Sequence, residues 1–200
     1  ASQVTSLAAS GADTFFNGST LLACPNALEQ ATAANWERTA SFVSGTCSSK
    51  ALMGLAGQNA DGVIAVTNIK DPMDPAYAED PAMVEYRATL DEFGEADVDP
   101  DNGIVAYGYT QGALLVEALK KMEEPNRANL MESIRTMDGG SAGLLLDGAT
   151  ATTSEDDPFL VENVQLVQYD AAAAHFSGMG EILDFEGKTA DITPEGLINS

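Results

Sequence analysis

The sequence predicts an α/β fold built on a parallel sheet. Between residues 1 and 67, short apolar segments alternate with segments whose apolar residues recur at helical spacing. Residues 62–67, Gly-Val-Ile-Ala-Val-Thr, are apolar and β-branched, as in a strand that is covered on both faces. Helices that alternate with strands are typical of βαβ units, whose strands run parallel.

The first elements are expected in the order helix, strand, helix, strand, helix, strand. Val4 and Leu7 fall on one helical face of residues 1–10, and Gly11 then ends the helix. Because this segment lacks the basic and apolar regions of a signal peptide, we expect a mature or truncated fragment that begins within a helix. The other elements are strands over 13–18, 40–45 and 62–67, and helices over 25–36 and 49–56.

The later part of the chain predicts longer helices and fewer strands. Residues 81–93 form an amphipathic helix with Met83, Tyr86, Leu90 and Phe93 on its apolar face. Residues 181–200 are the least patterned, and we expect them to be partly mobile. The remaining elements are a loop over 68–80, a linker or lobe crossing over 94–103, helices over 104–122 and 126–137, a short apolar strand over 143–147 and an antiparallel strand over 161–169.

Composition excludes several classes of function. The chain has 200 residues and 44% hydrophobic residues, which suits a globular protein with a real core. Its formal net charge of -22, with a pI near 4.1, repels nucleic acid and anionic lipid surfaces. We therefore expect no nucleic-acid partner and a solvated acidic surface, as in secreted or salt-adapted proteins.

No catalytic residue, cofactor or metal site is predicted. His175 is the only histidine, and it lacks a neighbouring acid or nucleophile pattern. Gly-rich nucleotide motifs and a nucleophile elbow are both missing from the sequence. Asp71, Asp74, Glu79 and Asp80 share one loop, but without the spacing of a calcium-binding loop they predict a solvated segment.

Two cysteines lie just beyond two neighbouring strands. Cys24 and Cys47 are 23 positions apart, and the carboxyl ends of parallel strands meet at one edge of a sheet. A disulfide, which needs Cα atoms about 5.5 Å apart, is therefore feasible. It would contribute about 3 kcal/mol and indicate an oxidising compartment. The alternative is two buried free thiols, with Cys47 then available as a nucleophile of an α/β enzyme.

Small polar residues gather at the same edge. Open α/β sheets bind ligands there, and hydroxyls beside helix N-termini suit a carboxylate or another small polar solute. Helix capping by Ser and Thr is the alternative explanation for each of them. The residues are Asn17, Ser19 and Thr20 after the first strand, and Ser44, Thr46 and Ser48 after the second.

The order of three segments resembles a known family. They are Ala9-Ser-Gly-Ala-Asp-Thr-Phe-Phe-Asn-Gly-Ser19, the stretch 55–64 with its following loop 70–75, and the Tyr107 helix over 106–119. Together they are similar to type I periplasmic binding proteins of the branched-chain amino acid (Leu/Ile/Val) class, the substrate-binding components of ABC importers. The resemblance extends from residue 9 to about 170.

The resemblance implies the C-terminal half of a two-lobe clamshell. Residues 1–97 would form the ligand-binding lobe, 98–170 the hinge crossing and return to the other lobe, and 171–200 a tail. It further implies a monomer that closes on a solute, works with an ABC permease and needs no cofactor, in the periplasm or outside the cell, with a lipid anchor as one option for its N-terminus. The ligand-binding residues would be Ser19, Thr20, Thr46 and Tyr107.

One departure from the family bears on the solute. Amino-acid binders usually carry an acid near the position of Thr46, and neither Thr46 nor Cys47 supplies this charge. The solute could thus be an amino acid, a carboxylic acid or an amide. A ligand-sensing receptor or regulator domain with the same clamshell is the alternative function.

Overall fold

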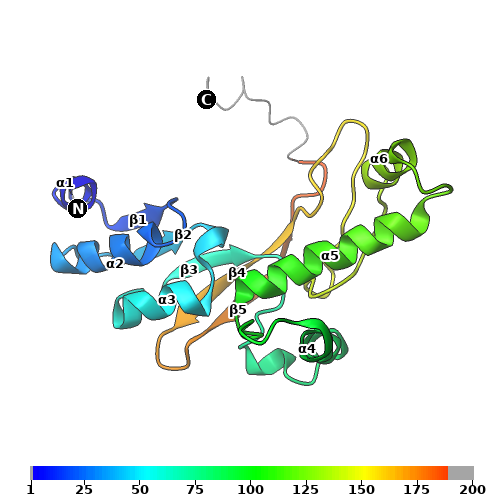
Figure 1. The fold of residues 1–200 in the computed structure, drawn as a ribbon. Helices are drawn as coiled ribbons and strands as arrows, with labels where there is room; N and C mark the ends of the chain where they lie inside the picture. The colour runs from blue at the N-terminus through cyan, green and yellow to red at the C-terminus, as the bar shows by residue number, and fades with distance from the viewer. Residues whose placement is uncertain (1, 189–200) are drawn as a thin grey trace. The chain divides into compact units, whose positions relative to one another are not determined.

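The computed structural model describes residues 2–188, and its elements are labelled in Figure 1. The chain divides into two compact units. Unit 1 comprises residues up to 67, residues 71–106 and residues 165–181. Unit 2 comprises residues 68–70, residues 107–164 and the described residues from 182 onward. The predicted ranges 1–97, 98–170 and 171–200 stay a prediction for the lobes of the whole protein.

A five-stranded sheet organises unit 1 and confirms the α/β fold class. The first three strands are parallel, with Phe42 of the middle strand paired to Phe16 and Ile64. The fourth strand runs antiparallel to the third, as predicted, and the last two strands continue into unit 2. In sheet order the strands are β1 (Thr14–Asn17), β2 (Ala40–Val43), β3 (Ile64–Thr67), β4 (Asn163–Asp170) and β5 (His175–Asp184).

One face of the sheet carries the core. Leu28 and Met53 are fully buried on the helices that cover this face. Val4 of the first helix packs into the same core. Trp36 packs on Phe15 in a tilted arrangement with ring centroids 5.0 Å apart, and its Nε1 donates to the carbonyl of Ala12. The helices are α1 (Ser2–Ala8), α2 (Ala23–Ala33) and α3 (Lys50–Ala56), with 3-10 turns η1 (Gly45–Cys47) and η2 (Gly57–Ala60).

The opposite face is open. In β3 burial alternates, with Ala65 2% and Val66 39% exposed, and Phe16 of β1 is 72% exposed. The expectation that both faces of this strand are covered is therefore wrong for the described residues. The apolar run reflects β-propensity on both faces and packing on one.

The acidic loop that follows β3 is structural. Asp74 and Asp80 accept backbone N–H bonds at the starts of η3 (Pro75–Tyr77) and α4 (Pro81–Phe93). Asp71 accepts from the backbone of Met73 and Phe176 at 2.9 and 3.3 Å, and its burial raises the pKa of its carboxyl. The expected solvated loop is thus corrected to a set of turns and caps, because Asp side chains satisfy orphan N–H groups at helix starts.

Unit 2 contains most of α5 (Gly103–Lys121), together with α6 (Arg127–Arg135). Residues 143–147 do not form the predicted strand. Leu145 makes a single bridge with Ile69, and the backbone N–H of Leu144 donates to Thr110 Oγ1 at 3.0 Å. The apolar run is buried by packing and not by a strand ladder.

The end of the described chain also differs from expectation. Residues 175–184 form β5, although 181–200 showed no pattern in the sequence. The part of the expected mobile segment at 189–200 lies outside the described residues. None of the described helices combines the length and the apolar character needed to cross a membrane.

Candidate functional site

Two loops meet at the carboxyl edge of β1 and β2. The register pairs Asn17 with Val43, the last residues of the two strands, so the loops that follow leave the sheet side by side. The backbone N–H of Ser44 donates to the carbonyl of Asn17 at 3.1 Å and joins the loops directly. The sheet edge predicted from the sequence is therefore assembled within unit 1.

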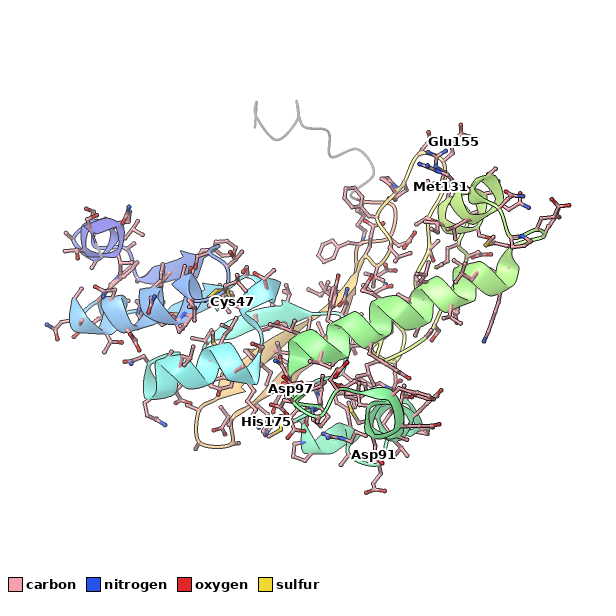
Figure 2. The ribbon with its side chains drawn as sticks, viewed as in Figure 1. Cys47, Asp91, Asp97, Met131, Glu155 and His175 are labelled. Atoms are coloured by element: carbon pink, nitrogen blue, oxygen red, sulfur yellow. A yellow bond between two sulfur atoms is a disulfide. The ribbon has the colours of Figure 1, made fainter. Side chains whose placement is uncertain are left out.

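A disulfide fastens this edge. Cys24 in the first turn of α2 and Cys47 in η1 are bonded, with Cα atoms 6.1 Å apart, and both are fully buried. Figure 2 shows the yellow sulfur atoms beside the Cys47 label. The predicted pairing is confirmed, and the alternative of free thiols, with Cys47 as a nucleophile, is wrong.

Asn17 organises the first loop from beneath. Its side chain is buried, and its Nδ2 donates to the carbonyl of Cys24 at 3.2 Å. Its Oδ1 accepts from both the backbone N–H and the hydroxyl of Ser19, at 3.2 and 2.5 Å. Asn17 therefore holds the predicted residue Ser19 in one orientation. The sequence placed Asn17 at this edge but did not predict it as a ligand-binding residue.

Ser44 links the second loop to the first. Its hydroxyl donates to the carbonyl of Ser19 at 2.8 Å and lies 2.9 Å from Thr46 Oγ1. Because the one proton of Ser44 is used on Ser19, the hydroxyl of Thr46 donates to Ser44. Ser19 and Thr46 thus belong to one network, and Ser44, which sequence reasoning did not select, connects them.

The two other predicted residues are not members of this hydrogen-bond network. Thr20 is exposed, and its carbonyl accepts from the backbone of Ala23 at 3.2 Å. Tyr107 is 49% exposed on α5 and belongs to unit 2. Their contribution to a ligand site stays a prediction.

The edge is electrically neutral. Asn17, Ser19, Ser44 and Thr46 carry no charge, and a disulfide replaces two thiols beneath them. Asp101 of unit 1 forms ion pairs away from this edge, with Arg87 at 2.8 Å and Lys50 at 3.8 Å. The arrangement can bind polar groups by hydrogen bonds.

The hydrogen-bonding neighbours of His175 lie in its own strand. It begins β5, where Figure 2 labels it, and its Nδ1 lies 3.2 Å from the carbonyl of Phe176 and 3.4 Å from Ser177 Oγ. These partners are part of the strand itself. These contacts of the histidine therefore belong to the structure of β5.

A family model described as periplasmic binding protein matches residues 1–174. The chain belongs to the periplasmic binding protein family. No curated protein matches the sequence. In this member of the family the hydroxyl network lies at the carboxyl ends of the parallel strands β1 and β2.

Solved structures agree with this periplasmic binding protein fold. A branched chain amino acid ABC transporter protein from Thermus thermophilus with bound valine matches with a TM-score of 0.69 at 14% identity, covering 92% of this chain and 49% of that one. A leucine binding protein from Thermotoga maritima matches with a TM-score of 0.66 at 14% identity, covering 92% and 48%.

A third structure, a possible leucine/isoleucine/valine-binding protein from Rhodopirellula baltica, is 20% identical. Its TM-score is 0.65, and the match covers 84% of this chain and 42% of that one. This periplasmic binding protein chain therefore spans about half the length of the structures that it matches. At these identities the likeness shows the fold, and the ligands of those proteins stay theirs.

Proposed function

We propose that the chain is part of the solute-binding component of an ABC importer and that the carboxyl edge of β1 and β2 contacts a small polar solute. The observation that carries the proposal is the network of Asn17, Ser19, Ser44 and Thr46, fixed by a buried disulfide at the ligand edge of a parallel sheet. A rigid polar edge is preorganised, which lowers the cost of binding.

The direction of the hydrogen bonds favours one end of the solute. The three hydroxyl protons are used within the network, on Asn17 Oδ1, the Ser19 carbonyl and Ser44 Oγ. The lone pairs of Ser44 and Thr46 remain as acceptors. Unit 1 thus suits an ammonium or amide N–H of the solute better than a carboxylate, which keeps amino acids and amides as the preferred class.

The mechanism is closure without covalent chemistry. A solute that contacts two lobes stabilises the closed form by its differential affinity for that form. Thr20 and Tyr107 are proposed as further contacts, and residues 1–97 and 98–170 as the binding lobe and the hinge with its return segment. A membrane permease is the proposed partner of the monomeric closed form, and the disulfide supports a location in the periplasm or outside the cell.

Direct binding tests the proposal. Titrations of the 15N-labelled chain with amino acids, their amides and simple carboxylates, followed by NMR chemical shifts, detect dissociation constants up to the millimolar range. We expect saturable shifts around Ser19 and Thr46 for solutes that carry an N–H donor. Shifts confined to carboxylates, or none with any of these solutes, would contradict the proposal.

A matched pair of variants locates the site. Thr46→Val removes one hydroxyl from the network. Thr39→Val makes the same change just before β2, where the Thr39 hydroxyl donates to the Asp13 carbonyl. We expect Thr46→Val to weaken binding about tenfold, since one hydrogen bond contributes about 1.4 kcal/mol at most. Thr39→Val should bind as the parent chain does, and equal losses in both variants would place the solute elsewhere.

A further inference from the structure

Three acidic side chains of unit 2 converge on one point. Asp157, Glu162 and Glu186 each place one carboxylate oxygen so that the three atoms lie within 4.8 Å of one another. Asp157 and Glu162 are only 8% and 5% exposed. Two oxygens on opposite sides of a Ca²⁺ ion, each at about 2.4 Å, are about 4.8 Å apart, so the three atoms fit one coordination sphere.

The Asp157 carboxylate has one unsatisfied oxygen. Its Oδ1 accepts from the backbone N–H of Phe159 at 3.2 Å. Its Oδ2 is buried and has no hydrogen-bond partner among the described residues. A buried polar atom without a partner costs on the order of 1–3 kcal/mol, and more if charged, so folded proteins rarely leave one. A cation held between the three carboxylates would satisfy this oxygen.

The backbone holds the cluster in place. Glu162 Oε2 accepts from the backbone N–H of Gly187 at 3.1 Å, and the Glu162 carbonyl accepts from Phe185, also at 3.1 Å. The Ser154 N–H donates to the Asp157 carbonyl at 2.8 Å and closes the turn before it. Two segments distant in sequence, 157–162 and 184–187, are therefore already aligned where their carboxylates meet.

We propose that Asp157, Glu162 and Glu186 bind one Ca²⁺ ion, which joins the segment 157–162 to the end of β5. The donors are all hard oxygens, which favour Ca²⁺ or Mg²⁺ over metals that prefer nitrogen or sulfur. Ca²⁺ is favoured over Mg²⁺, because Mg²⁺ demands a near-ideal octahedron at about 2.1 Å and dehydrates reluctantly. The site is separate from the proposed solute edge, so either proposal can fail alone.

Calorimetric titration of the EDTA-treated 200-residue chain with CaCl₂ tests the site. The buffer contains about 0.15 M NaCl, which screens diffuse binding to the acidic surface. We expect one Ca²⁺ per chain with a dissociation constant of about 1 mM or tighter, and weaker binding of MgCl₂. Asp157→Asn and Glu186→Gln should each weaken Ca²⁺ binding at least tenfold, and Glu186 is exposed, so its variant tests the site without altering the core. Asp156→Asn, an exposed neighbour with the same change in charge, should bind as the parent chain does.

Thermal unfolding adds a readout that a purely structural role of Asp157 would not give. With EDTA, Asp157→Asn should melt at or above the temperature of the parent chain, because a buried unsatisfied carboxylate is removed. With Ca²⁺ the order should reverse, since only the parent chain gains from the ion. The proposal is overturned if Ca²⁺ heats do not saturate, if Asp156→Asn loses binding equally, or if the two melting temperatures keep the same order with and without Ca²⁺.

Discussion

Removing the disulfide should loosen the sheet edge and destabilise unit 1 by a calculable amount. The bond joins Cys24 to Cys47, 23 positions apart in sequence. In the chain-entropy relation, a loop of this size adds about 3.4 kcal/mol to the free energy of unfolding. Cys24→Ala/Cys47→Ala is the suitable double variant, because both sulfur atoms are buried and serine would add an unsatisfied hydroxyl.

Urea unfolding followed by tryptophan fluorescence measures the loss. Trp36 is the only tryptophan, and it packs on Phe15 in the core of unit 1. With an m-value of about 2 kcal/mol per molar urea, the midpoint should fall by about 1.7 M. The parent chain unfolded with a reductant serves as the control and should coincide with the double variant. A loss below about 1 kcal/mol in both would refute the loop-entropy reasoning.

Three smaller perturbations follow from single residues. Gly143→Ala should destabilise unit 2 by more than about 2 kcal/mol in urea unfolding, because its φ is +63° and a Cβ would lie 2.7 Å from the Cα of Thr110. Gly139→Ala is the control, since Gly139 has a φ of +62° but open space around a Cβ. It should cost only the backbone strain, about 1 kcal/mol. Tyr86 is buried, which raises its pKa to about 12, so absorbance titration should find one tyrosine that ionises about two pH units above the ordinary tyrosine value of about 10. Stability should fall as the pH rises from about 10, because the unfolded chain ionises this hydroxyl first. Burial raises the pKa of Asp71, so the stabilising contribution of its protonated form is lost as the pH rises through that pKa. The stability of Asp71→Asn relative to the parent chain should therefore increase from about pH 4 to about pH 7. A constant or falling difference would contradict the assignment.

The elements before residue 68 follow from local patterns in the sequence. Alternating periods of apolar residues fix where strands and helices lie, and Ser49 and Gly57 cap α3 at both ends as their residue types predict. The disulfide was predictable because both cysteines follow strands that end at the same edge. The apolar periods and helix caps that define this part of the fold are all short-range in sequence.

The errors lie where tertiary contacts decide. Residues 143–147 have the composition of a strand, yet Thr110 and a bridge from Ile69 take their hydrogen bonds, so no ladder forms. The strand β5 contains Gly178 and Gly180, which weaken any strand pattern, and it forms because β4 pairs with it.

The candidate sites show the same division. Ser19 and Thr46 could be selected as hydroxyls at strand ends, but the connecting role of Ser44 depends on which atoms its single proton reaches. The cluster of Asp157 and Glu186 had no sequence signal, since its members are far apart along the chain and match no spacing motif.

The open face of the sheet has a consequence for handling this chain in solution. Among the described residues β1 is an edge strand, and it presents Phe16 with 72% of its surface exposed. An exposed apolar edge strand is a template for pairing between molecules. At neutral pH a charge of -22 keeps the molecules apart. Near the pI of about 4.1 that repulsion vanishes, so acidification should convert a dispersed protein into one that associates through β1.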